Sequence, residues 1–136
     1  MIFILLDNSQ WWAKRLNVIQ TNLQVVDTNK INPKRLVQQI KDLQGDALIF
    51  NTGGIYAWYD TSIKYHYIND YLNPKYDLIG QMIEQCHTKG IKFIARFDFN
   101  MAHDYVFNDH PEWFVQDVHR SPIIPGAYRP GNWDLL

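Results

Sequence analysis

The chain has 136 residues, of which 46% are hydrophobic and 20% charged, and its net charge at pH 7 is −1. This composition suits one domain with an ordinary core and excludes the membrane-spanning and disordered classes. Lys and Arg are spread along the chain, so we expect neither a nucleic-acid nor a membrane partner. The single Cys86 cannot form an internal disulfide, and the apolar run at residues 2–6 lacks the basic flank of a signal peptide. We therefore predict a cytoplasmic protein.

The first predicted strand follows an N-terminal extension of about 15 residues. Residues 2–6 could form a strand or a segment packed against a neighbouring surface, and the sequence does not decide between them. Ser9 is a suitable N-cap for a short helix that reaches Leu16. Residues 18–23 alternate apolar and polar side chains, which predicts an extended strand with Asn22 at its carboxyl end.

A helix and a second strand come next. Asn32 followed by Pro33 is typical of a helix start, because Asn accepts from free N–H groups and Pro has no N–H to leave unpaired. Gly45 is the expected stop. The predicted apolar stripe of this helix consists of Leu36, Val37, Ile40 and Leu43. Residues 47–50 are continuously apolar, as in a buried parallel strand, and they run into the small residues at 51–54.

The segment 55–76 is predicted to be a long loop rich in Tyr, with Trp58, Tyr59 and His66 among its members. Loops longer than about 12–15 residues inside a domain usually have a function, so we expect ligand contacts here. Aromatic rings bind the apolar face of a sugar while polar neighbours bind its hydroxyls. Alternatively, the loop packs its own aromatic cluster and touches no substrate.

Asp77 is predicted to cap a second helix that ends at Gly90, and residues 91–99 then form a third, buried strand. The expected apolar stripe of this helix is Leu78, Ile79, Met82, Ile83 and Cys86. Arg96 and Asp98 stand at i and i+2, so both point to the same side of the sheet at the carboxyl end of the strand, where ligands bind in α/β folds. Burying such charges is costly unless they pair or face a cleft. The pair could equally be an internal ion pair that only positions the next loop.

The remaining sequence predicts short elements. Residues 100–108 suit a helix that carries His103, which is either a site residue or a solvated helix residue. His110 and Pro111 break it. Residues 113–118 and 122–124 suit two extended pieces around a turn near His119, and loop or an ordered tail follows.

Alternating strands and helices call for a parallel sheet. The chain has neither G-x-G-x-x-G after its first strand nor a Walker loop, so it lacks the signatures of nucleotide-binding folds. A complete (β/α)8 barrel needs about 250 residues. We therefore predict an α/β fold, a partial (β/α)8 (TIM) barrel with about three to four βα units, as a single domain over residues 1–136. Its open strand edges would need a cover, which could be the N-terminal segment, the tail, a second copy of the chain or a missing C-terminal barrel half.

Several motifs agree in order with a family of glycoside hydrolases, which the sequence resembles over about residues 16–130. They are Val18 to Leu23, Leu48 to Ile55 with Trp58 and Tyr59, Asp77 to Gly80, Ile94 to Phe99, His103, and His110 to Trp113. The resemblance implies the N-terminal part of a (β/α)8 catalytic domain. The segment from Gly54 to Trp58 is also distantly similar to a sugar-binding loop of α-L-fucosidases. Thr52 and Gly53 replace the paired histidines of those enzymes, so fucose specificity does not follow from the similarity.

The resemblance implies a carbohydrate ligand and an incomplete catalytic pair. Fucosidase-like barrels carry the nucleophile on the fourth strand and the acid later, and we expect this chain to end before both. Glycoside hydrolysis needs two carboxylates, about 5–5.5 Å apart for retention or about 6.5–9.5 Å apart for inversion. We predict Asp98 as the catalytic candidate. The predicted substrate-binding residues are Asn22, Asn51, Trp58, Tyr59, His66, Arg96 and His103.

Other chemistries have weaker support. The five histidines lack H-E-x-x-H or another tight ligand spacing, so we predict no metal and no cofactor. Cys86 stands in an apolar helix stripe, where a thiol is inert. The competing hypothesis is a non-enzymatic domain that binds carbohydrate or associates with itself.

Overall fold

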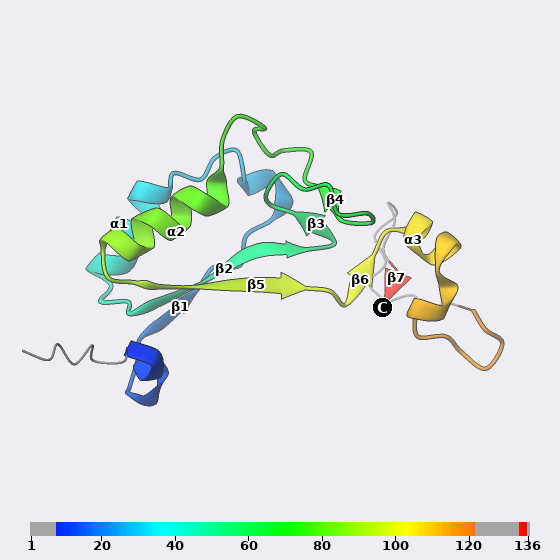
Figure 1. Ribbon diagram of the computed structural model, residues 1–136, viewed down its shortest axis with the longest axis horizontal. Helices are drawn as coiled ribbons and strands as arrows, with labels where there is room; N and C mark the ends of the chain where they lie inside the picture. Colours follow the sequence, from blue (N-terminus) through cyan, green and yellow to red (C-terminus); the bar gives the residue numbers. More distant parts are fainter. Residues whose placement is uncertain (1–7, 122–133, 136) are drawn as a thin grey trace, which may run out of the picture.

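Helices alternate with parallel strands in a computed structural model, which describes residues 8–121 and 134–135 (Figure 1). The predictions for residues 2–6 and 122–124 lie outside the described residues. In chain order the elements are η1 (Asn8–Ala13), β1 (Val18–Gln20), η2 (Val25–Asp27), α1 (Pro33–Asp42), β2 (Ala47–Gly54), β3 (Tyr56–Ala57), β4 (Tyr67–Ile68), α2 (Leu78–Thr88), β5 (Lys92–Asp98), β6 (Met101–Ala102), α3 (Asp104–Asp109), η3 (Pro111–Trp113) and β7 (Asp134–Leu135).

A parallel three-stranded sheet in the order β1-β2-β5 forms the centre of the fold. Strand β2 lies in the middle, with Ile19 beside Leu48 on one side and Ile49 beside Ile94 on the other. Helices α1 and α2 lie together on one face of this sheet (Figure 1). The arrangement confirms the predicted α/β fold with parallel strands.

Both predicted helix starts are confirmed by their capping bonds. The Asn32 side chain accepts a hydrogen bond from the Arg35 N–H at 3.0 Å, and Pro33 opens α1. The Asp77 carboxylate accepts from the Gly80 N–H at 2.8 Å and caps α2. These local bonds satisfy N–H groups that have no partner within the helix.

The end of α1 differs from the prediction. The left-handed residue is Gln44, with φ of 57°, while the Gly45 N–H donates to the Ile40 carbonyl at 2.9 Å. Leu43 was predicted to belong to the apolar stripe, but it is the C-cap and its side chain is exposed. The stripe therefore ends at Ile40, because the chain leaves the helical path one turn later. Gly90, with φ of 70°, follows α2 as predicted.

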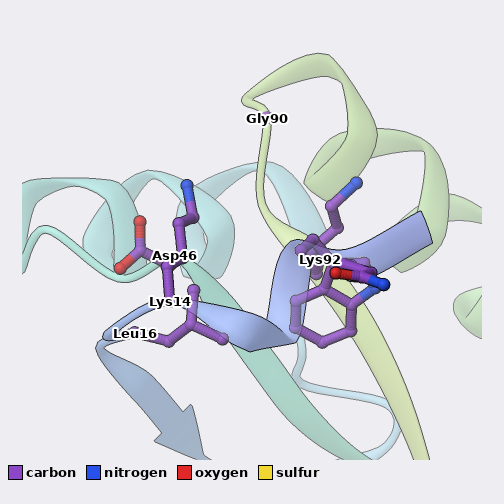
Figure 2. Close-up of a pocket in the computed structure, with 7 residues that line it drawn as sticks. Lys14, Leu16, Asp46, Gly90 and Lys92 are labelled. Atoms are coloured by element: carbon purple, nitrogen blue, oxygen red, sulfur yellow. The ribbon is translucent and has the colours of Figure 1, made fainter. Parts of the chain in front are cut away.

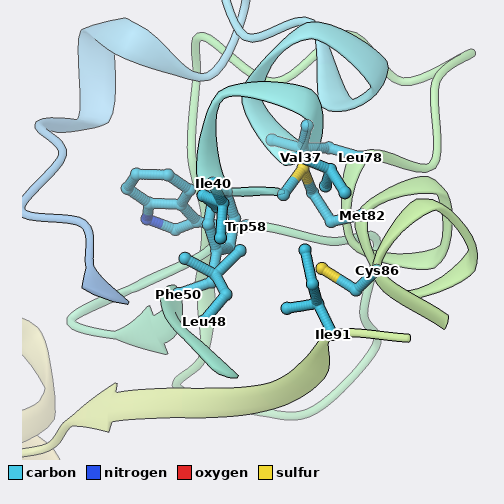
Figure 3. Packing of buried hydrophobic residues seen from close by; sticks show 9 residues of the cluster. All are labelled: Val37, Ile40, Leu48, Phe50, Trp58, Leu78, Met82, Cys86 and Ile91. Carbon is cyan, nitrogen blue, oxygen red and sulfur yellow. The ribbon is translucent and has the colours of Figure 1, made fainter. Parts of the chain in front are cut away.

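The hydrophobic core lies between the sheet and the two helices (Figure 3). Leu48 and Phe50 of β2 point toward the helices, and the core is completed by Val37 and Ile40 of α1, Leu78, Met82 and Cys86 of α2, and Trp58 and Ile91. The unbroken apolar run of β2 reflects its central place in the sheet, with a strand on each side and helices above.

Strand β5 is less buried than predicted. Ala95 and Phe97 are exposed although Phe93 packs against the core. In the described part of the chain β5 pairs only with β2, so it forms an edge of the sheet. An edge strand has a neighbour on one side only, which explains the partial exposure.

The predicted long loop contains more structure than its sequence indicates. Strands β3 and β4 pair in parallel within it. The buried Asn69 amide donates to the Val25 carbonyl at 2.9 Å and to Thr28 Oγ1 at 3.3 Å, which fastens the loop to the segment after β1. The loop is therefore ordered by tertiary hydrogen bonds.

Smaller differences concern the two ends of the described region. The predicted helix before Leu16 is the 3-10 helix η1. Strand β1 is shorter than predicted, although the Thr21 N–H still donates to the Ile49 carbonyl at 3.0 Å. The helix predicted from residue 100 begins at Asp104, because Met101 and Ala102 form β6. The predicted turn near His119 is confirmed.

No helix within 8–121 or 134–135 is long and apolar enough to cross a membrane.

Two adjacent substitutions after α1 should have opposite effects on stability. Gln44→Gly should raise the free energy of unfolding by about 1 kcal/mol, because glycine adopts a positive φ without steric cost. Gly45→Ala should lower it by about 1–3 kcal/mol. A methyl group there would lie 2.6 Å from Ile40 Cγ2 and 3.0 Å from Ile19 Cδ1. Chemical denaturation measures both changes, and equal signs would contradict this account of the helix end.

Candidate functional site

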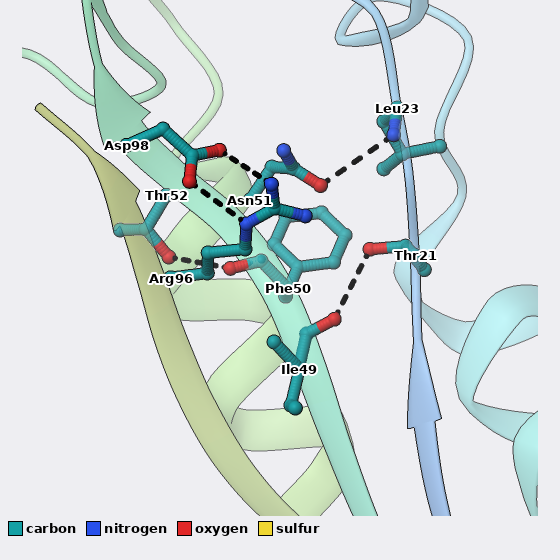
Figure 4. Close-up of polar contacts among 8 residues, drawn as sticks. All are labelled: Thr21, Leu23, Ile49, Phe50, Asn51, Thr52, Arg96 and Asp98. Atoms are coloured by element: carbon teal, nitrogen blue, oxygen red, sulfur yellow. Dashed lines mark hydrogen bonds and ion pairs between the residues drawn. The ribbon is translucent and has the colours of Figure 1, made fainter. Parts of the chain in front are cut away.

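A charged pair lies at the carboxyl end of β5 (Figure 4). Arg96 Nη2 is 2.8 Å from Asp98 Oδ2, and Arg96 Nε donates to Asp98 Oδ1 at 3.1 Å. The two side chains are 30% and 46% exposed, respectively. The pair is therefore a two-point contact that solvent and a ligand can both reach.

Asn51 of β2 stands beside this pair, because it is the register partner of Arg96. Its Oδ1 accepts a bond from the Leu23 N–H at 3.5 Å, and Thr21 Oγ1 donates to the Ile49 carbonyl at 3.3 Å (Figure 4). These bonds join the carboxyl ends of β1 and β2. Asn22, at the same end of β1, is exposed.

One donor of the guanidinium is unused within the described residues. Arg96 Nη1 is buried and has no hydrogen-bond partner there. An unpaired buried donor costs about 1–3 kcal/mol, whereas the other two guanidinium nitrogens of Arg96 are paired with Asp98. We name Asn51, Arg96 and Asp98 the edge triad.

The edge triad lies on the sheet face opposite the helices. Leu48 and Phe50 face the helices, so alternation along β2 directs Asn51 to the other side. On β5, Phe93 packs against the core, and Arg96 and Asp98 therefore also point away from it.

A second group of predicted residues lies on the helix side of the same strand ends. Phe97 points opposite to its neighbours in β5 and covers Gly53, where an added methyl group would lie 2.6 Å from the ring. The same methyl group would lie 3.3 Å from His66 Nε2. The Tyr59 hydroxyl and His66 Nδ1 are 3.4 Å apart. His66 and Tyr59 are thus separated from the edge triad by the strand backbone.

A cavity of about 370 Å³ opens beside this second group. Its volume falls in the range of about 300–1,000 Å³ that is common for ligand pockets. Its lining is mostly aromatic and apolar, and consists of Gly54, Ile55, Tyr59, Ile63, Lys64, Tyr65, His66, Phe99, Met101, Ala102, His103, Val106 and Trp113. Gly54 is the register partner of Asp98, so the cavity begins next to the end of β5.

Both histidines of this cavity are held toward their neutral form. Burial lowers the pKa of His66. Burial also lowers the pKa of His103, partly offset by a hydrogen bond with the Ile55 backbone and by the charge of Asp104. His103 is only 8% exposed. A neutral imidazole can both donate and accept a hydrogen bond, which suits contact with hydroxyl groups.

Three tyrosines surround His103. The centroid of its ring lies 5.1 Å from those of Tyr56 and Tyr67 and 5.7 Å from that of Tyr105, with the Tyr105 ring nearly parallel. The predicted aromatic loop therefore contacts the segment after β5 through this histidine.

Trp58 lies in the hydrophobic core, whereas its predicted role in sugar binding requires an accessible ring. It is 4% exposed and packs edge to face on Phe50, with ring centroids 5.9 Å apart. A ring buried in the core has no free face for a sugar, so we leave Trp58 out of the candidate site. The surrounding sequence predicts that Trp58 is a loop residue, but the loop directs its ring into the core.

Sequence reasoning missed Phe99 and Trp113, which line the cavity. The sequence contains a signal for Phe99, since Phe97 and Phe99 alternate with Arg96 and Asp98. Their rings stack with centroids 5.4 Å apart and an interplanar angle of 13°.

A cavity of about 490 Å³ lies at the opposite, amino edge of the sheet (Figure 2). Lys14, Lys92, Asp46 and Trp11 contribute to its lining. Ligands of α/β folds bind at the carboxyl edge, so we do not include this cavity in the candidate site.

Neither a metal site nor a reactive thiol emerges from the described residues. They contain no group of three or more His, Cys, Asp and Glu that could hold a metal ion. Burial raises the pKa of the Cys86 thiol to about 11, so it stays protonated in the core at neutral pH.

The chain is a parallel α/β domain with polar side chains at the carboxyl edge of its sheet, the edge at which α/β folds that bind ligands place them. Comparison with known sequences gives the family. The chain belongs to the family described as hypothetical glycosyl hydrolase 6, which matches residues 32–133. No curated protein sequence matches the chain.

Solved structures support the fold. An α-L-fucosidase isoenzyme 2 from Paenibacillus thiaminolyticus aligns with a TM-score of 0.61 and 16% identity, over 90% of this chain and 19% of the other. An α-amylase from Lactobacillus plantarum aligns with a TM-score of 0.54 and 19% identity, over 89% of this chain and 31% of the other. The chain thus spans a minor part of each, and its fold is similar to that part of TIM-barrel glycosidases.

The lowered pKa of His103 predicts a pH dependence of stability. A neutral buried histidine contributes stability that is fully present above the unfolded pKa of about 6.5 and is lost as pH falls toward the folded pKa. His103→Phe should therefore reduce the loss of melting temperature between pH 7 and pH 5. His119→Phe, at an exposed position, is the control. Parallel pH profiles for wild type and His103→Phe would contradict the prediction.

Proposed function

We propose that this chain forms the sugar-binding part of a glycoside hydrolase catalytic domain, with carbohydrate bound at the carboxyl edge of β2 and β5. One observation carries the proposal: two neighbouring strands bring Asn51, Arg96 and Asp98 together at this edge, with Arg96 and Asp98 partly open to solvent. Membership of a glycosyl hydrolase family supports a carbohydrate as the ligand.

The edge triad offers both kinds of hydrogen bond that a sugar needs. The Asp98 carboxylate accepts from hydroxyl groups, while the Asn51 amide can donate to ring or hydroxyl oxygens. Bonds to charged groups are about twice as strong as neutral ones. Tyr59, His66 and His103 on the other side of the strand ends would contact more distant parts of the ligand.

Hydrolysis requires a second carboxylate beside Asp98. Asp98 supplies the carboxylate of the edge triad. We propose that it is one member of the catalytic pair or a group that orients the substrate. We expect the chain by itself to bind sugar without cleaving a glycosidic bond. Turnover of an aryl glycoside by the purified chain would contradict this expectation.

The second candidate function is a non-enzymatic domain that associates with itself. It is favoured by the sheet edges, since among the described residues β1 and β5 each pair on one side only. Unpaired edges readily accept another strand. Sedimentation velocity should then show a dimer whose fraction rises with concentration, and a monomer at all concentrations would remove this candidate.

We also place the protein in the cytoplasm. Its only cysteine is a free, buried thiol, which suits a reducing compartment. Localisation of the tagged chain in its native cell would test this.

Asp98→Asn should weaken sugar binding and leave the stability of the chain nearly unchanged. The ion pair with Arg96 is half exposed, so its loss should change the free energy of unfolding by less than about 1 kcal/mol. Affinity for sugar should fall about tenfold or more, because a bond to a charged group is worth about 1.5–3 kcal/mol. Calorimetric titration with L-fucose, D-galactose and D-glucose measures the affinity.

A matched control is Asp42→Asn on α1, whose carboxylate is exposed and accepts a bond from Gln38 at 2.8 Å. It should leave sugar affinity unchanged. If Asp98→Asn unfolds the chain, Asp98 is required for stability, and the prediction that it mainly contacts the ligand is wrong. If the wild type binds none of the three sugars, the proposed function is wrong.

A further inference from the structure

We infer that Trp113 provides a second sugar-binding position, so that the carbohydrate taken by this protein is an oligosaccharide. This rests on the proposed function and extends it to a substrate class. The observation behind it is a half-exposed indole, fixed by two neighbouring rings, in the wall of the cavity that begins beside Asp98.

Neighbouring rings hold the Trp113 indole in place. It lies parallel to the His110 imidazole, with centroids 3.8 Å apart and an interplanar angle of 3°. The Tyr65 ring meets it edge to face at 5.8 Å. The Tyr65 hydroxyl in turn donates to Asp109 at 2.9 Å. A ring fixed before binding loses little conformational entropy when a ligand arrives.

The Trp113 side chain remains 53% exposed although one of its faces is covered by His110. A fixed, flat and open apolar surface suits the C–H face of a pyranose. Polar groups lie beside the two rings that hold it, His110 and Tyr65, and could contact the hydroxyls. The exposed Glu112 carboxylate lies 2.9 Å from His110 Nδ1, and the Lys64 amine lies 4.3 Å from the centre of the Tyr65 ring. This mixture of a ring face with an acceptor and a donor favours a sugar over a purely apolar ligand.

The cavity extends from Trp113 to the end of β2, on the opposite side of the strand ends from the edge triad. Gly54, the register partner of Asp98, and Trp113 line the same cavity, with Tyr59 and His66 in its wall. A sugar chain with one ring at the edge triad would pass the end of β5 beside Gly54 and place another ring on Trp113. The protein should therefore bind an oligosaccharide more tightly than the corresponding monosaccharide.

The test compares D-glucose with maltotetraose and D-galactose with β-1,4-galactotetraose by calorimetric titration. For at least one pair, the wild type should bind the tetrasaccharide roughly 5- to 10-fold more tightly than the monosaccharide, the range expected for one added ring contact. Trp113→Ala should abolish this gain and leave the monosaccharide affinity unchanged.

Trp12→Ala is the matched control, since Trp12 is 60% exposed and packs edge to face on Trp11. Both belong to η1, which lies near the start of β1, at the other end of the sheet (Figure 1). It should change neither affinity. Trp113→Leu keeps apolar bulk without a flat face and should behave like Trp113→Ala, which covers the case in which the alanine variant fails to fold.

The outcomes distinguish the two proposals. Equal affinities of the wild type for the monosaccharide and the tetrasaccharide in both pairs would overturn the inference and leave the proposed function standing. A gain that survives in both Trp113 variants would do the same. Absence of binding to every sugar tested would overturn both.

Discussion

The parallel pairing of β2 with β1 and β5 determines both the core and the site. It directs Leu48 and Phe50 toward the helices, where they form the centre of the core. The same alternation directs Asn51 to the opposite face, beside Arg96. Stability and ligand contact thus depend on one register, and a slip by one residue would expose the core and bury the charges.

Local signals in the sequence were sufficient for the elements but not for their ends. Asn32 and Asp77 bond to N–H groups three residues away, so both helix starts could be predicted without knowledge of the fold. The end of α1 could not, because the positive φ falls on Gln44 rather than on the neighbouring glycine. The exposure of β5 depends on strand order, which no local pattern contains.

The candidate site could also be predicted only in part, because spacing along a strand is a local signal and contacts between distant segments are not. Spacing along one strand showed that Arg96 and Asp98 share a side, and the structure joins them in an ion pair. Spacing could not show that Tyr59 and His66 lie on the other side of the strand ends, since the loop that carries them is ordered by distant contacts such as those of Asn69. The burial of Trp58 in the core could not be predicted for the same reason, because Trp58 belongs to this loop.

The close contact between Gly53 and Phe97 has a consequence for sequence variation in the family. Strand β2 has an irregular register between Asn51 and Gly53, which places Gly53 directly beside Phe97. A side chain at position 53 requires the phenyl ring at 97 to move, because an added methyl group would lie 2.6 Å from that ring. The two positions should therefore covary, with a larger residue at 53 accompanied by a smaller one at 97. Such an exchange would move bulk from one strand to its neighbour and reshape the space in front of His66, a simple route by which related chains could come to prefer different ligands.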